Sequence, residues 1–374
     1  MWKKWICCLI VIVCLGCMTV QAEPAVSSLS AILYLPETGQ VLYEKDADTR
    51  RPMASTTKLM TALLGAEELE LDAELTIPQE AVLVEGSSLG LRGGDRITAR
   101  DLLTGMLLES GNDAANAVAL TVEDTLEAFA QRMNERAAVL GMTNSLFVTP
   151  SGLDADGHGS SARDMALLGA AVLEHPALAA ICATKTASIS FGDPPVIHTI
   201  ANHNRLLTKM EDCVGLKTGY TTKAGRCLVS AVTRGDITLV AVSLNGHDYW
   251  NDHQKMYEYG FAQVMRLSLP ETTLPTVTVS GGVTKSVALC FEPPTAPIVA
   301  AGDTHTVTTV LEMPAFVLAP VMAGDEIGSI RYMDGEQELC RAPLYAAETI
   351  EAAPVASVWT WWWHWFCALL TAWG

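Results

Sequence analysis

The chain has 374 residues, a length that suits two domains of ordinary size. Hydrophobic residues make up 49% of the chain and charged residues 18%, which excludes an intrinsically disordered protein. The formal net charge of −18 excludes nucleic acid as the expected partner, because phosphate backbones are bound by basic surfaces.

Residues 1–22 have the pattern of a secretory signal peptide. Lys3 and Lys4 precede an apolar run from Ile6 to Gly16, and small residues precede Glu23. The apolar run is too short to indicate a membrane-spanning helix. Lipid attachment at Cys17 is a second interpretation, which ranks below simple cleavage because the residues before it match a lipoprotein cleavage site only loosely. Both interpretations predict export.

The cysteines give no metal-binding pattern. Four of the 10 lie in the predicted signal peptide. The other six form no C-x-x-C pair and have no histidine at metal-ligand spacing, so we expect no zinc site; they are Cys182, Cys213, Cys227, Cys290, Cys340 and Cys367. Export permits disulfides, but the spacing does not assign them, and pairing of Cys213 with Cys227 stays open.

The periodicity of residues 23–269 predicts strands at both ends and helices between them. Residues 31–46 form a hairpin pattern around a Thr-Gly turn. Helical patterns follow at 54–69, 96–110, 111–120, 125–141 and 161–175, strand patterns at 186–200, 213–220, 226–233 and 237–246, and a last helical pattern at 253–265. We expect an α/β (α+β) domain with one sheet built from both ends of this region and a helical insertion.

The composition changes at about Pro270. Short β-type runs separated by Pro and Gly predict a small all-β domain over residues 270–350. A linker and a Trp-rich segment complete the chain at 351–374.

The Trp-rich segment has the pattern of a terminal amphipathic helix. One face carries Ser357, Thr360, His364, Cys367 and Thr371, and the opposite face carries Trp359, Trp362, Trp363, Phe366, Leu370 and Trp373. The helix would span about 25 Å at ~1.5 Å per residue, which is short for crossing a bilayer. We expect it to lie on a membrane surface, and docking onto the protein's own core is the alternative. The segment has no Lys or Arg to attract anionic lipid.

Three short motifs occur in an order that suggests acyl-transfer chemistry. Ser55 and Lys58, at i and i+3 of a helix, can touch, and a desolvated neutral lysine can activate a serine. Ser110 and Asn112 lie in a break between two helices, where they can relay a proton and hold a carbonyl. Lys217, Thr218 and Gly219 form a K-T-G motif on the predicted strand 213–220. Taken alone, the three motifs also fit a helix N-cap, a second N-cap and a basic hairpin edge.

In the order S-x-x-K, S-x-N and K-T-G, the motifs resemble those of the low-molecular-mass penicillin-binding proteins, which are serine-type D-alanyl-D-alanine carboxypeptidases. The stretches 147–169, 184–189, 202–207 and 214–231 are also similar to this family, and the resemblance covers nearly all of the chain after the signal. It implies a penicillin-binding/β-lactamase-like transpeptidase fold with an antiparallel sheet. It also implies removal of the terminal D-alanine from peptidoglycan stem peptides in cell-wall maturation, with β-lactams as covalent inhibitors.

The resemblance assigns the catalytic roles to three side chains. Ser55 would attack the carbonyl between the two terminal D-alanines, and Lys58 would be the base. Ser110, with Lys217 near it, would pass a proton to the departing D-alanine. Neither a metal nor an organic cofactor is implied, and the enzyme would work at the outer face of the cytoplasmic membrane.

Substrate binding is assigned to the residues beside these groups. Asn112 would bind the substrate amide, and Thr218 the terminal carboxylate. Gly219 would let the substrate backbone approach the strand. The backbone N–H groups of Ser55 and Tyr220 would form the oxyanion hole.

One feature departs from many members of the family. A downstream arginine often helps to bind the substrate carboxylate, but residues 245–255 contain no arginine. His247, His253 or Arg226 could replace it, or Thr218 and Lys217 could suffice; the sequence leaves this open.

Three other functions are alternatives to a carboxypeptidase. A class A β-lactamase would need a deacylating glutamate in an E-x-x-L-N-like loop, and no such loop occurs between Ser110 and Lys217. A catalytically silent wall-binding protein would have no need to keep all the motif residues. A peptidoglycan DD-endopeptidase using the same site stays open as the alternative, because the motifs do not set that preference.

Overall fold

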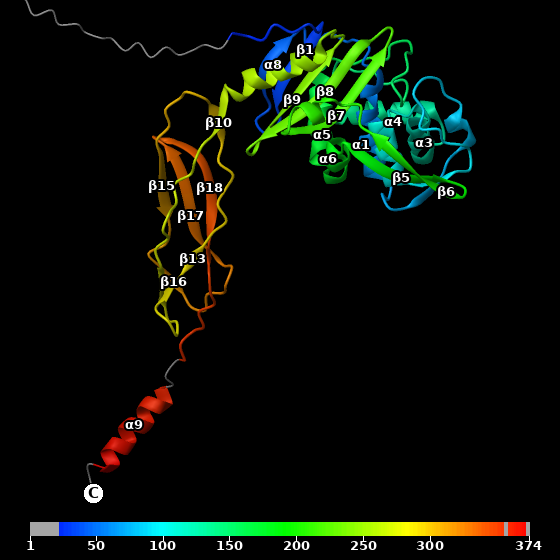
Figure 1. The fold of residues 1–374 in the computed structure, drawn as a ribbon. Helices are drawn as coiled ribbons and strands as arrows, with labels where there is room; N and C mark the ends of the chain where they lie inside the picture. The colour runs from blue at the N-terminus through cyan, green and yellow to red at the C-terminus, as the bar shows by residue number, and fades with distance from the viewer. Residues whose placement is uncertain (1–21, 355–357, 372–374) are drawn as a thin grey trace, which may run out of the picture. The chain divides into compact units, whose positions relative to one another are not determined.

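The structure is a computed structural model, which describes residues 22–354 and 358–371 (Figure 1). All but the last residue of the predicted signal peptide lies outside the described residues, as do Ser357 and Trp373. The chain forms two compact units that divide between Ala262 and Gln263. Each unit is described by itself.

The first unit is built on a five-stranded antiparallel sheet in the order β2-β1-β9-β8-β7. Its strands are β1 (Ser30–Leu35), β2 (Gln40–Lys45), β7 (Cys213–Thr221), β8 (Gly225–Arg234) and β9 (Ile237–Leu244). Because β1 pairs directly with β9, the early and late parts of the unit meet in one sheet, as the sequence predicted.

The prediction of a single sheet was wrong for residues 186–200. Strands β5 (Thr186–Gly192) and β6 (Pro195–Ala201) pair with β3 (Glu74–Thr76) and β4 (Arg96–Thr98) in a separate sheet. The β5–β6 hairpin is too exposed to be an inner part of the main sheet. In β6 only Ile200 is buried, whereas the inner strands of the main sheet are buried on both faces.

The helical insertion lies between β2 and β7 in the chain, and side-chain caps mark several of its helices. The hydroxyls of Thr98, Thr125 and Ser161 accept hydrogen bonds from the third residue of the helices that follow. The elements are η1 (Ala54–Thr57), α1 (Lys58–Glu68), η2 (Gln79–Val82), α2 (Ala99–Leu108), α3 (Asn112–Val122), α4 (Leu126–Val139), α5 (Ala162–Glu174), α6 (Pro176–Ala183) and α7 (Leu206–Lys209).

Helices α5 and α8 (Tyr249–Phe261) cover opposite faces of the main sheet (Figure 1). A Cβ added at Gly169 of α5 would meet Val240, and one at Gly260 of α8 would meet Leu239. Since Leu239 and Val240 are neighbours on β9, their side chains point to opposite faces. Both glycines therefore allow a helix to lie close to the sheet.

In the part of the chain that the structure describes, no single helix is long and apolar enough to cross a bilayer. Helices α5 and α6 reach that length and composition only together, across a bend of 105°. Both contribute fully buried residues to the core of the first unit, including Leu168 and Leu178.

The second unit is a set of short β-strands, as predicted, and ends in a helix. It has three small sheets, in the orders β10-β14, β12-β11-β16 and β13-β18-β17-β15. The elements are β10 (Val264–Arg266), β11 (Val277–Ser280), β12 (Ser286–Val287), β13 (Leu289–Cys290), β14 (Ile298–Ala300), β15 (Val307–Glu312), β16 (Phe316–Leu318), β17 (Glu326–Asp334), β18 (Gln337–Ala346) and the predicted terminal helix α9 (Val358–Thr371). From Trp361 onwards the side chains of α9 are exposed.

Candidate active site

Ser55 lies in the short turn η1, which leads directly into α1. The residue before it, Ala54, has a φ of +49°, in the left-handed region that side chains other than glycine disfavour. This backbone is packed closely against another loop, because a Cβ at Gly152 would lie 2.0 Å from the Ala54 carbonyl oxygen. The caps of η1 and α1 are Met53 and Thr57, so the N-cap interpretation of Ser55 is wrong.

Lys58 joins Ser55 to the second motif. Its Nζ donates hydrogen bonds to the Asn112 Oδ1 at 2.7 Å and the Ser151 carbonyl oxygen at 2.6 Å, and it lies 3.0 Å from the Ser55 Oγ, where a neutral amine can accept the hydroxyl proton. The side chain is fully buried, and burial together with the positive charge of Lys217 holds the pKa of Lys58 well below the usual lysine value, while Asp113 opposes the shift. A lysine with a lowered pKa can accept a proton from a neighbouring hydroxyl.

Ser110 and Asn112 lie where α2 ends and α3 begins. Ser110 has a φ of +64° and is 6% exposed, and Asn112 donates from its Nδ2 to the Glu85 carbonyl oxygen at 2.7 Å. The N-cap of α3 is Gly111, and no side chain caps this helix. The capping interpretation of the S-x-N motif is therefore wrong, and Asn112 instead bonds to Lys58.

The K-T-G motif lies on β7, the edge strand of the main sheet. Lys217 is 1% exposed, and its burial lowers its pKa to about 8. A lysine that protects a sheet edge must be solvated, so the hairpin-edge interpretation is wrong. Thr218 is half-buried, and Tyr220 is 65% exposed.

Gly219 was expected to let a substrate backbone approach the strand, but the atoms closest to it belong to the chain's own η1 turn. A Cβ at this position would lie 2.9 Å from the Met53 carbonyl oxygen, 2.9 Å from the Ser55 nitrogen and 3.0 Å from the Thr56 nitrogen. All three are backbone atoms, which cannot rotate away as a side chain can. Only glycine therefore lets β7 lie against the turn that carries Ser55.

A cavity of about 490 Å³ brings the exposed parts of the three motifs together. Ser55, Ser110, Thr218, Gly219 and Tyr220 line it, whereas the buried Lys58, Asn112 and Lys217 do not. Its wall also contains residues that the sequence did not indicate as a set, namely Ser87, Asn202, His203, Arg205, Arg226, Tyr249 and Trp250. They come from four separate stretches of chain, so no single local pattern could have brought them together.

Asp113 is a further residue that sequence reasoning missed. It is fully buried and accepts hydrogen bonds from the backbone N–H groups of Leu89, Gly90 and Leu91 and from the Ser88 hydroxyl. It therefore fixes the loop that follows η2 and runs past Ser87 at the cavity. In the sequence, the one feature that could have indicated a role for Asp113 is its position directly after Asn112.

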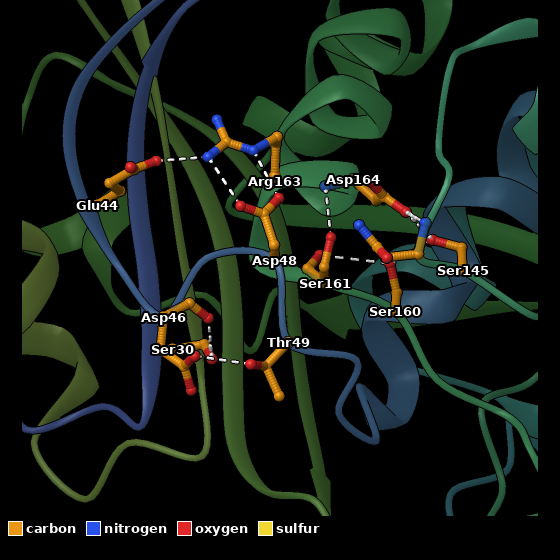
Figure 2. A network of polar contacts seen from close by, with 11 residues as sticks. Ser30, Glu44, Asp46, Asp48, Thr49, Ser145, Ser160, Ser161, Arg163 and Asp164 are labelled. Carbon is orange, nitrogen blue, oxygen red and sulfur yellow. Dashed lines mark hydrogen bonds and ion pairs between the residues drawn. The ribbon is translucent and has the colours of Figure 1, made fainter.

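The chain that leads to Ser55 is anchored by a polar network (Figure 2). Arg163, in the first turn of α5, donates from its Nε to Asp48 at 2.7 Å. Ser160 exchanges two backbone hydrogen bonds with Arg51, at 2.8 and 2.9 Å, and its hydroxyl lies 2.7 Å from that of Ser145. Asp164 accepts from the Ser145 hydroxyl at 2.7 Å. These contacts hold the segment before η1 against the N-terminus of α5.

The sequence left His247, His253 and Arg226 as possible replacements for the missing arginine, and the structure separates these three residues. His253 is fully buried between β8, β9 and α8, where its ring nitrogens bond the Ser230 and Ser243 hydroxyls at 2.7 and 2.9 Å. Burial lowers its pKa to about 3, so His253 cannot reach or attract a ligand in the cavity. His247 is exposed and is not part of the cavity wall, whereas Arg226 is.

The cysteines and acidic side chains form no further site in the described ranges. All six described cysteines are free thiols, so Cys213 and Cys227 are not paired. Within the same residues, no group of three or more His, Cys, Asp or Glu side chains is arranged to hold a metal ion.

Comparison with known proteins assigns both units to described families. Residues 17–248 match the family model "D-alanyl-D-alanine carboxypeptidase", and residues 270–352 match "Penicillin-binding protein 5, C-terminal domain". The chain is 33% identical to the D-alanyl-D-alanine carboxypeptidase DacC of Escherichia coli over 353 residues, which cover 89% of this chain and 86% of DacC. It is 29% identical to DacF of Bacillus subtilis over 343 residues, or 89% of this chain and 88% of DacF.

A solved structure is also similar to a large part of the chain. The Streptomyces K15 DD-transpeptidase superposes with a TM-score of 0.61 and 32% identity, and the match covers 64% of this chain and 99% of that one. Proteins named D-alanyl-D-alanine endopeptidase are also similar to part of the chain, among them one from Pseudomonas aeruginosa that is 34% identical over 229 residues.

Proposed function

The chain belongs to the D-alanyl-D-alanine carboxypeptidase family, and we propose how its own residues carry out the family's reaction. It is a serine-type carboxypeptidase of the penicillin-binding protein class. The observation that carries the assignment of roles is the 3.0 Å contact between the Lys58 Nζ and the Ser55 Oγ, made by a lysine that is fully buried.

Acylation begins when Lys58 takes the hydroxyl proton of Ser55. The Ser55 oxygen attacks the carbonyl between the two terminal D-alanines of a stem peptide, and a Ser55 ester replaces the peptide bond. The lowered pKa of Lys58 supports its role as the base. Water then hydrolyses the ester and releases the shortened peptide.

The departing D-alanine needs a proton on its nitrogen. We assign this transfer to Ser110, which lines the cavity beside Ser55, with Lys217 as the adjacent positive charge.

The backbone supplies the oxyanion hole in this mechanism. The N–H groups of Ser55 and Tyr220 would donate to the carbonyl oxygen as it becomes negative. The close approach of β7 to η1 at Gly219 supports this assignment, because it brings the backbone of Ser55 close to β7 directly before Tyr220. Asn112 would hold the substrate amide, and Thr218 the terminal carboxylate.

The direct test is release of free D-alanine from a diacyl-lysyl-D-Ala-D-Ala peptide by the wild-type protein and by Ser55→Ala. Release by the wild type alone supports the proposal, with Ser55 as the nucleophile. If neither protein releases D-alanine while penicillin still acylates Ser55, the site is competent and the endopeptidase alternative is favoured. If D-alanine is not released and penicillin does not acylate Ser55, the proposed chemistry is refuted.

We also propose that the protein acts at the outer face of the cytoplasmic membrane and that α9 binds the membrane surface. Members of the family act on the cell wall, outside the cytoplasm. The support from α9 is its content of exposed aromatic side chains, including Trp361, Trp363 and Trp365. Because the helix has no Lys or Arg, apolar burial must provide the binding energy.

Sedimentation with vesicles of phosphatidylcholine alone tests this proposal. The protein without residues 1–22 is expected to bind, and the same protein also lacking residues 355–374 is expected to stay in solution. Binding should change little between low and high salt, since it does not depend on lipid charge. Equal binding by both proteins, or by neither, would refute the anchor.

A further inference from the structure

We propose that Arg226 binds the terminal carboxylate of the substrate and so selects peptides that end in a free acid. This inference rests on the proposed function, in which the departing residue is a D-alanine with a free carboxylate. It assigns to the cavity a cation that the three motifs do not include.

The register of the main sheet places Arg226 of β8 beside the part of β7 that lines the cavity. Arg226 on β8 is directly opposite Tyr220 on β7, and Thr218 is two residues from Tyr220 on the same strand. Opposed residues of an antiparallel pair share a face, as do residues two apart, so all three side chains lie on one side of the sheet. All three line the same cavity as Ser55.

Two aromatic rings hold the guanidinium of Arg226. Its Cζ lies 5.9 Å from the centre of the Tyr220 ring and 5.8 Å from the centre of the Tyr249 ring. Tyr249 is itself only 8% exposed and packs against Trp250, with ring centres 4.4 Å apart. Contact with ring faces uses none of the five N–H donors, which stay available for a carboxylate.

Nothing else occupies those donors in the part of the chain that the structure describes. Arg163, Arg234 and Arg331 are each paired with a carboxylate there, whereas no carboxylate pairs with Arg226. An arginine held by rings and left without an anion, in the wall of a cavity that also contains Ser55, is preorganised for an anionic ligand.

The other cations near the cavity suit this role less well. Lys217 is buried and does not line the cavity. His203 lies 3.5 Å from the Glu109 carboxylate, and burial and Lys217 hold its pKa below the usual value, so it is neutral at pH 7. Arg205 lines the cavity at the start of the short helix α7, on a different element from Thr218, Tyr220 and Arg226, and serves as the matched control.

The test compares two substrates that differ only at the C-terminus: diacyl-lysyl-D-Ala-D-Ala and the same peptide ending in D-alaninamide. For Arg226→Ala we expect kcat/KM to fall by about 10- to 100-fold with the free acid and by less than about twofold with the amide. Arg226→Lys should recover part of the loss, because it restores the charge without the planar fork. Equal losses on both substrates, or a larger selective loss in Arg205→Ala, would overturn the proposal.

A second measurement separates this inference from the proposed function. The rate of Ser55 acylation by benzylpenicillin, which has a carboxylate, is compared with that by its methyl ester. Arg226→Ala should slow the first rate by about 10-fold or more and leave the second nearly unchanged, even if the wild type releases no D-alanine. Acylation by the ester also shows that the variant is folded, and equal slowing of both rates would refute the role of Arg226.

Discussion

The Nζ atom of Lys58 lies between the Ser55 Oγ and the Asn112 Oδ1, at 3.0 and 2.7 Å, and its third partner is the Ser151 carbonyl oxygen. All three partners are uncharged, so no ion pair offsets the burial of a lysine charge at this position. One side chain thus joins the turn of the nucleophile to the start of α3, and its environment favours the neutral amine that the proposed chemistry needs.

Replacement of Lys58 tests its role as the base. Lys58→Ala should slow acylation of Ser55 by a fluorescent penicillin about 10²- to 10⁴-fold, the usual contribution of a general base. Lys58→Arg should be equally slow, because a guanidinium stays protonated and cannot accept the Ser55 proton. Thermal unfolding of each variant controls for loss of structure. Acylation by Lys58→Ala within tenfold of the wild-type rate would contradict the assignment.

Lys217 predicts an alkaline limit to the reaction. Its pKa is lowered by burial to about 8, so the side chain is protonated below that pH and loses its charge above it. If the positive charge assists the proton transfer through Ser110, the acylation rate should fall as the pH rises through about 8. In Lys217→Arg, whatever rate remains should be maintained to higher pH. A wild-type rate that stays constant up to pH 10, or an alkaline limit unchanged in Lys217→Arg, would show that the charge is not required.

Gly219→Ala tests the contact between β7 and η1. The added Cβ would lie 2.9 Å from the Ser55 nitrogen, and a backbone displacement of several tenths of an ångström is needed to relieve this contact. We expect acylation to slow at least about 100-fold, because the oxyanion hole depends on the same two segments. Gly235→Ala is the control: it strains a turn with a φ of +61° but meets no atom within 4 Å. Similar acylation rates in the two variants would contradict the prediction.

The sequence predicted those parts of the site that depend on local spacing. Ser55 and Lys58 meet because an i, i+3 pair on a helical turn must meet, whatever the rest of the fold does. The meeting of both ends of the unit in one sheet, seen in the pairing of β1 with β9, followed from the strand patterns at both ends of this region. The order of the three motifs then identified the family, although no single motif did.

Contacts set by tertiary packing could not be predicted. The hairpin of β5 and β6 has an ordinary strand pattern, and only its neighbours decide which sheet it joins. His253 occurs in a polar stretch, but the first residues of α8 turn it inwards, between two serines of the sheet. The roles of Gly219 and Asp113 depend on backbone atoms that are distant in the chain, and backbone atoms leave no trace in a residue pattern.

His253 predicts how the stability of the first unit depends on pH. Its pKa is about 3 in the folded state, against about 6.5 for an exposed histidine, so the unfolded chain binds a proton that the folded chain does not. As the pH falls from about 6.5, this difference should lower the free energy of unfolding by about 1.4 kcal/mol per pH unit. His253→Gln should reduce the slope by that amount in urea unfolding at pH 7, 6, 5 and 4, although it is less stable than the wild type at pH 7. The exposed His247→Gln should keep the wild-type slope. Equal slopes in His253→Gln and the wild type would mean that His253 takes up its proton without unfolding, against the burial that holds it neutral.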